Sequence, residues 1–256
     1  MKVQYCSDLH LEFSYNSAFL KANPLKVEGE ILLLAGDIIP FAMMDKAKWF
    51  FDFVSDHFKV TYWIPGNHEY YRFNIDKEDI ALHEKIRDNV FLVNNHIAIH
   101  EHVKFIFSTL WSTISPAYAW EIQQSISDFD LIKYTQKSLT PFHFNQFHNT
   151  SRTVIEKALA QKDAEKTIVV THHVPTFMNY PTKYKGSSLN EAFAVELYDL
   201  IEQSNADYWI YGHHHQQVDD FVIGKTQLTT NQLGYVEYNE NPDFSLGKVI
   251  DFSLHT

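Results

Sequence analysis

The stretch Tyr211-Gly212-His213-His214-His215 closes an apolar run that is typical of a buried strand. Four earlier stretches have the same form, in which side chains able to bind a metal directly follow an apolar segment. They are Cys6-Ser7-Asp8-Leu9-His10, Ala35-Gly36-Asp37, Pro65-Gly66-Asn67-His68-Glu69 and Val170-Thr171-His172-His173. Ligand sites in open α/β sheets form outside the carboxyl ends of the strands, so we expect these side chains to converge in space.

A single Asp or His at the end of a strand is usually a cap or a turn residue. Five such segments on five expected strands are harder to explain in that way, because clustered His and Asp side chains are typical of a metal or catalytic site. The set therefore predicts a site that no single motif would predict. Its members are Asp8, His10, Asp37, Asn67, His172, His213 and His215.

The expected elements alternate along the chain between strands and helices. Short apolar runs predict strands at 2–6, 30–36, 59–65, 166–171 and 207–211, and a meander over 90–110. Helical spacing predicts helices over 46–58, 76–88, 149–161 and 191–203, whereas 11–28 and 174–189 are expected to be loops. Turns are expected at Gly224, Gly234, Asn241-Pro242 and Gly247. This alternation is typical of an α/β domain.

A chain of 256 residues with 45% hydrophobic residues can bury one large core. No repeat, linker or low-complexity segment divides it, so we expect a single domain over residues 1–256. Residues 111–147 form the least regular and most aromatic part. An insertion of this kind can be a substrate lid held by a rigid scaffold, or its aromatic side chains can simply pack against one another.

The formal net charge of -11, with no long basic run, disfavours tight binding to nucleic acids. The single cysteine, Cys6, excludes an intramolecular disulfide and is expected to be a buried, inert thiol. The first residues lack the apolar core of a signal peptide, and the apolar runs are shorter than the roughly 20 residues that span a bilayer. We therefore expect a cytoplasmic protein without a membrane segment.

The order of these motifs, from Asp8 to His215, resembles that of the calcineurin-like metallophosphoesterase superfamily, in its bacterial form. The resemblance implies a four-layer α/β/β/α sandwich of two mixed sheets flanked by helices. It also implies two metal ions about 3.5–4 Å apart, the usual separation in phosphate-cleaving sites with two metals.

The resemblance assigns four ligands to each ion, with Asp37 as the bridge between them. One ion is assigned to Asp8, His10, Asp37 and His215, and the other to Asp37, Asn67, His172 and His213. Imidazoles select transition metals over Mg²⁺ or Ca²⁺, so Mn, Fe or Zn ions are the expected cofactors.

The implied reaction is in-line attack on phosphorus by a hydroxide that bridges the two ions. His68 resembles the proton donor to the leaving oxygen, a role that suits an imidazole because its usual pKa is roughly 6.5. His173 and the ligand Asn67 are candidates for a substrate contact, His173 through the phosphate. His214 is expected to be structural, and Glu69 is expected to orient its loop.

The sequence departs from the phosphoprotein phosphatases of the superfamily. Those enzymes carry an acidic residue and an Arg shortly after the bridging Asp, and another Arg before the Gly-Asn-His-Glu motif, where this chain has Pro40, Phe41 and Pro65. The missing arginines disfavour a phosphoserine substrate. The missing acid leaves open which residue orients His68.

The sequence thus predicts a hydrolase of a small phosphodiester or phosphomonoester, which could be nucleotide-like. One alternative is a non-catalytic metal-binding scaffold of the same fold, although all seven ligands and His68 are present. Another is a Mn-dependent nuclease, which would need a basic track for its strand. The oligomeric state stays open.

Overall fold

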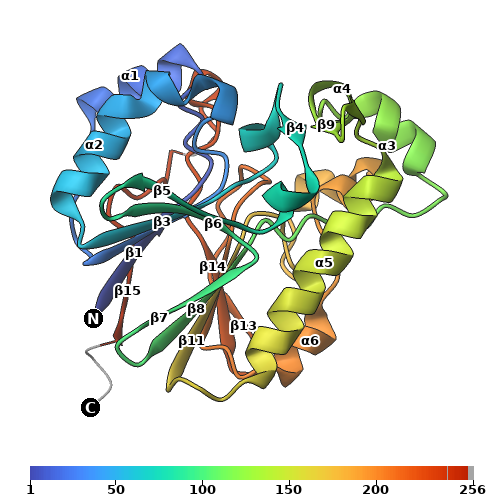
Figure 1. Cartoon of the computed structure of the whole chain (residues 1–256). Coiled ribbons are helices and arrows are strands. Elements are labelled where there is room, and N and C mark those ends of the chain that lie inside the picture. Colours follow the sequence, from blue (N-terminus) through green and yellow to red (C-terminus); the bar gives the residue numbers. More distant parts are fainter. Residues whose placement is uncertain (241, 253–256) are drawn as a thin grey trace.

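The computed structural model describes residues 1–240 and 242–252, so the turn expected at Asn241-Pro242 lies partly outside the described residues. Two six-stranded mixed sheets form the centre of the fold (Figure 1). The first has the order β15-β1-β2-β3-β6-β5, and its strands are β15 (Val249–Asp251), β1 (Lys2–Cys6), β2 (Ile31–Ala35), β3 (Val60–Ile64), β6 (Val90–Asn94) and β5 (Leu82–Arg87). The second has the order β13-β14-β12-β11-β8-β7, and its strands are β13 (Phe221–Ile223), β14 (Thr226–Thr230), β12 (Tyr208–Tyr211), β11 (Lys166–Thr171), β8 (Val103–Ser108) and β7 (His96–His100).

Each sheet has four central parallel strands and an antiparallel strand at each edge. Helices α1 (Ser14–Ala22) and α2 (Lys48–His57) cover the outer face of the first sheet, and α5 (Pro141–Ala160) and α6 (Tyr198–Gln203) cover that of the second (Figure 1). The predicted four-layer α/β/β/α sandwich is therefore confirmed.

The apolar side chains explain why the layers stack in this way. In β2, Leu32 and Leu34 pack toward the helices, whereas Leu33 belongs to the core between the two sheets. A third core joins the second sheet to its helices and contains Ile155 and Trp209. Parallel strands buried on both faces need such continuous apolar runs, and these runs are the reason that the strands could be predicted from the sequence.

Two expectations for helices were wrong. The segment expected to be a helix over 76–88 contains a short 3-10 helix, Lys77–Ile80, followed by strand β5, which pairs antiparallel with β6. The charged side chains of β5 occupy an exposed sheet edge, where charge discourages pairing with other chains. The helix expected over 191–203 is interrupted, because Val174 and Ala194 form a parallel bridge and only α6 follows it.

One helix lies where a loop was expected, and another helix begins earlier than expected. Residues 11–28, expected to be a loop, contain α1, where buried Asn16 donates hydrogen bonds to the carbonyls of Leu9 and Gly234. Helix α5 begins at Pro141 rather than near 149, because Thr140 caps it and proline is favoured at the first helical position. The remaining 3-10 helices are Phe41–Ala47, His68–Tyr70, Thr182–Tyr184, Ser188–Ala192 and Val236–Tyr238.

The segment 111–147 is built from short elements. Helices α3 (Ala119–Ser125) and α4 (Asp128–Leu131) precede β9 (Lys133–Tyr134) and β10 (Lys137–Ser138), and β9 pairs with β4 (Asn74–Ile75). Trp111, Phe129 and Phe144 share a separate apolar cluster there.

No helix in the described part of the chain is long and apolar enough to cross a membrane. Cys6 is a buried free thiol, as expected.

Candidate metal centre

The structure brings the seven predicted ligands together from both sheets. Asp8 and His10 follow β1, and Asp37 and Asn67 follow β2 and β3 of the same sheet. The second sheet contributes the residues that follow β11 and β12, namely His172, His213 and His215. All seven side chains therefore lie where the carboxyl ends of the parallel strands of the two sheets meet.

Four of these side chains form one cluster of potential ligand atoms. Asp8, His10, Asp37 and His215 each offer an atom within 4.8 Å of the others. The Nε2 atoms of His10 and His215 are 2.8 Å apart, and His215 Nε2 lies 3.4 Å from Asp8 Oδ1. Inward-facing nitrogens and carboxylate oxygens of this kind form a set of donors for a transition metal.

A second cluster shares Asp37 with the first. Asp37, His172 and His213 again place ligand atoms within 4.8 Å of one another. His172 Nε2 lies 3.4 Å from Asp37 Oδ2, 3.1 Å from His213 Nδ1 and 3.3 Å from Asn67 Oδ1. The geometry thus places Asp37 between two groups of donors, as a bridging ligand requires.

The carboxylates of the centre favour positive charge on two of its four histidines, His172 and His215. Burial lowers the pKa of His172, but the Asp37 carboxylate outweighs it and raises that pKa to about 9. In the same way, hydrogen bonds to Asp8 and Glu240 overcome burial and raise the pKa of His215 to about 10. The buried carboxylates therefore hold protons on these imidazoles when no metal neutralises them, and the residues fit a pair of cations.

The backbone is strained at these positions. Asp8, His10, Asp37, His213 and His215 all have positive φ, between 46° and 79°. Such a conformation costs about 1–3 kcal/mol for a residue other than glycine and persists only where the surrounding structure imposes it. Five strained residues in one cluster indicate that the fold maintains these side-chain directions for function.

The glycines of the motifs leave room for the donors. A Cβ at Gly66 would collide with the Asp37 carboxylate and the His172 ring, and one at Gly212 would collide with Ser7 and Asp8. Gly36 lies against the His172 ring and has a φ of 89°. Each glycine therefore permits a close approach between the backbone of one motif and the ligands of another.

The Glu69 carboxylate holds two of these loops together. Its Oε2 atom accepts hydrogen bonds from the backbone N–H groups of Asp37 and Gly66. Its Oε1 atom accepts hydrogen bonds from the backbone N–H of Ile38 and from the indole N–H of Trp63. Burial raises the pKa of Glu69, yet four N–H donors suit the carboxylate form. The arrangement agrees with the expected role of Glu69 in orienting its loop.

The comparisons with known proteins agree with this geometry. The model of the calcineurin-like phosphoesterase family matches residues 1–217. The chain belongs to the calcineurin-like phosphoesterase family. It is 34% identical over 267 residues to uncharacterized protein L509 of Acanthamoeba polyphaga mimivirus, with 93% of each chain covered. It also resembles the crystal structure of phosphopantetheinyl hydrolase from Mycobacterium tuberculosis, with a TM-score of 0.71, 16% identity and coverage of 97% of this chain and 95% of that one.

Membership in the calcineurin-like phosphoesterases indicates metal-dependent phosphoester hydrolysis, and the two His/Asp clusters are compatible with its metal site.

One carboxylate of this phosphoesterase was missed in the sequence. Glu12 Oε1 lies 3.1 Å from His68 Nδ1 and 3.2 Å from His10 Nδ1. Burial would raise the pKa of Glu12, but these two hydrogen bonds lower it to about 2. Glu12 therefore orients His68 in place of the acid absent at Pro40, and its position two residues after His10 was the available signal.

Two more acids of the phosphoesterase site escaped the sequence analysis. Asp128 Oδ1 accepts hydrogen bonds from Asn67 Nδ2 at 2.8 Å and from the Tyr71 hydroxyl at 2.9 Å. Because the amide nitrogen faces Asp128, the Asn67 oxygen faces the second cluster. Glu240 Oε2 lies 2.8 Å from His215 Nδ1. Asp128 begins the short helix α4 and Glu240 lies in a loop, and neither adjoins a motif, so no sequence signal marked them.

The two histidines next to the ligands differ in their surroundings. His173 is fully buried, its Nδ1 lies 3.3 Å from the Thr109 carbonyl, and its ring packs against Trp111 and His213. It does not line the cavity beside the centre, and the phosphate contact of His173 stays a prediction. Burial lowers the pKa of His214 to about 3, and its Nδ1 accepts a hydrogen bond from the backbone of Gln216.

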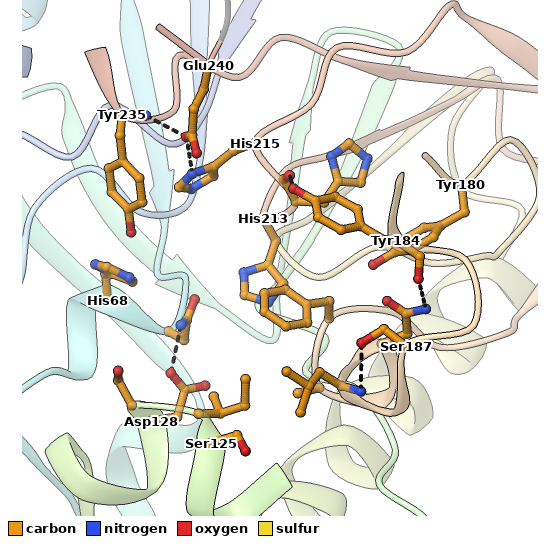
Figure 2. Close-up of a pocket in the computed structure, with 18 of the residues that line it drawn as sticks. His68, Ser125, Asp128, Tyr180, Tyr184, Ser187, His213, His215, Tyr235 and Glu240 are labelled. Carbon is orange, nitrogen blue, oxygen red and sulfur yellow. Dashed lines mark hydrogen bonds and ion pairs between the residues drawn. The ribbon is translucent and has the colours of Figure 1, made fainter. Parts of the chain in front are cut away.

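A cavity of about 390 Å³ adjoins the centre of this phosphoesterase. Figure 2 shows His68 and Tyr235 on one side of it, Tyr180 and Tyr184 on the other, and His213 between them. Its volume is in the range of small-molecule sites. The cavity gives a ligand access to His68 and to both clusters.

Proposed function

We propose that this protein hydrolyses a small phosphodiester or phosphomonoester with the help of two transition-metal ions. The observation that carries the proposal is the convergence of seven potential ligands from two sheets, with Asp37 shared between the clusters. This arrangement lies beside a cavity large enough for a small molecule and too short of basic groups for a nucleic-acid track.

The candidate ligands are assigned to two metal ions. Asp8, His10, Asp37 and His215 would hold one ion, and Asp37, Asn67, His172 and His213 the other. When bound, Mn, Fe or Zn ions in such a pair supply activation of water and neutralisation of the phosphoryl oxygens.

His68 is the proposed proton donor to the leaving oxygen. It lines the cavity, and its Nδ1 is engaged by Glu12, so its Nε2 is the nitrogen available to a substrate. Burial lowers the pKa of His68, but Asp37 and Glu12 outweigh it and raise that pKa. The raised pKa keeps more of the imidazole protonated near neutral pH, as a general acid requires.

The segment 111–147 is proposed to serve as a lid-like insertion within one domain. Its residues 125–128 line the cavity, and Asp128 fixes the amide of Asn67. The insertion thus contributes both a wall for the substrate and a contact that orients a ligand.

Metal analysis combined with a panel of phosphoesters tests the proposal. We expect close to two transition-metal ions per chain and turnover of bis-p-nitrophenyl phosphate or p-nitrophenyl phosphate, and the faster of the two identifies the ester type. His102→Ala serves as a histidine control outside the clusters. Protein that binds its metal ions but hydrolyses no phosphoester would favour the metal-binding scaffold, and cleavage of single-stranded DNA with Mn²⁺ as the best activity would favour the nuclease.

A further inference from the structure

The wall of the cavity opposite His68 is rich in aromatic and apolar side chains, although Ser187 and Asn190 also line it. It is formed by Tyr180, Tyr184, Leu189 and Phe193, which belong to the segment after β11, and by Ile126 of the insertion. Figure 2 shows Tyr180 and Tyr184 across the cavity from His68. A substrate whose phosphate reaches the metal centre therefore extends its remaining part toward these rings.

The rings of this wall are held in place by their own contacts. The Tyr184 hydroxyl donates a hydrogen bond to the His214 carbonyl at 3.3 Å, and Asn190 Nδ2 donates to the Tyr184 carbonyl at 2.7 Å. The Phe193 ring stacks on His213, with ring centroids 4.8 Å apart and an angle of 28°. The wall is thus a prepared surface, which lowers the entropy cost of binding a flat group.

The same wall lacks the cations that would bind a second phosphate. Among the described residues that line the cavity, none is Lys or Arg. The acids of the lining, Asp128 and Glu240, add negative charge. A second phosphate would therefore leave water without a cationic partner, which costs free energy that hydroxyl and amide donors alone offset poorly.

We infer that the substrate is a phosphoester whose organic part carries an uncharged ring and no second phosphate. The inference rests on the proposed function and narrows its substrate class. It includes aryl phosphates and esters of a single nucleoside phosphate, and it excludes nucleoside polyphosphates and sugar bisphosphates. Lys183 is exposed and lies outside the cavity lining, although its Nζ is 4.7 Å from the centroid of the Tyr184 ring.

Binding of hydrolysis-resistant phosphonates to the metal-loaded protein tests the inference by calorimetry. We expect phenylphosphonate to bind at least roughly tenfold more tightly than methylphosphonate, because the ring leaves water for an apolar wall. Benzene-1,4-diphosphonate is expected to lose that gain. A nucleoside 5′-phosphonate, compared with phenylphosphonate, shows whether the ring is a nucleobase or a plain arene.

Variants assign the effect to the wall. Tyr184→Ala is expected to reduce the ratio of phenyl to methyl affinity to about onefold to threefold, and Tyr184→Phe to retain it, since only the ring matters. Leu189→Ala repeats the test if Tyr184→Ala does not fold. Lys183→Ala is the matched control and should change no ratio.

The outcomes separate the two levels of the proposal. Equal binding of the methyl and phenyl ligands, tighter binding of the diphosphonate, or a loss of diphosphonate binding in Lys183→Ala would overturn the inference and leave phosphoester hydrolysis standing. Failure of every phosphonate to bind, together with no turnover of any ester, would instead reject the proposed function.

Discussion

Replacing Glu12 by Gln tests the link between this carboxylate and the proposed proton donor. Glu12 Oε1 binds both His68 Nδ1 and His10 Nδ1, and Gln keeps an acceptor oxygen while removing the charge. A hydrogen bond to a charged group contributes about 1.5–3 kcal/mol, against about 0.5–1.5 kcal/mol for a neutral one. Each contact is therefore expected to lose about 1–1.5 kcal/mol, which is close to a factor of ten.

The two losses should appear in different measurements. The weaker hydrogen bond to His68 is expected to lower kcat about tenfold for a phenyl ester, whose leaving group needs a proton. It should lower kcat much less for a p-nitrophenyl ester. The His10 share is expected to weaken metal binding by a similar factor, so assays are run at saturating metal with the metal content measured.

The pH profile of Glu12→Gln gives an independent check. Glu12 raises the pKa of His68, so removing its charge lowers that pKa, and the protonated imidazole is lost at lower pH. The alkaline fall in kcat should therefore move to lower pH. In a His68→Ala background the substitution should cost little more, because its target is gone. An equal slowing of both esters at full metal content, or an undiminished loss in that background, would refute the role of Glu12.

Three further predictions concern the metal centre. Asp37→Ala should lose both ions, since this carboxylate belongs to both clusters, and elemental analysis that still finds one tightly bound ion would contradict a bridging role. Asp128→Ala should weaken the second ion about 10–100-fold by freeing its amide ligand, whereas exposed Asp130→Ala should not, as metal titration would show. Metal affinity should rise with pH, by up to about tenfold per unit for each proton displaced, because His172 and His215 have pKa values of about 9 and 10 in metal-free protein. A pH-independent Kd between pH 6 and about 9 would show that these protons are not displaced.

The sequence predicted the layers of the fold where the chain is buried on both sides. The run 31–35 is apolar at every position, and in the structure it faces a helix layer on one side and the other sheet on the other. Strand β5 was mistaken for a helix because its exposed, charged side chains carry no clear period, and its conformation is set by pairing with β6. Tertiary contacts decided that segment, and local propensity did not.

The candidate site shows the same division. The convergence of the seven candidate ligands could be predicted because each follows a strand whose end is fixed by topology. Asp128 and Glu240 could not be predicted, because the short helix that Asp128 begins and the loop that holds Glu240 are both placed by tertiary packing. Glu12 is an intermediate case, because it follows His10 closely but acts on His68, which is 56 residues away along the chain. The ligand roles stay predictions until metal is measured, and the single domain is likewise a prediction.

The sharing of ligands between the two sheets has a consequence for how the chain folds. Neither half of the molecule holds a complete cluster, because His215 is needed beside Asp8 and His10, and Asp37 beside His172. Metal ions bound as proposed could therefore be captured only after the two sheets have docked. Metal added at the start of refolding should leave the rates of the early folding phases unchanged. It should slow the unfolding of the folded protein, so that the ions would stabilise the folded state kinetically.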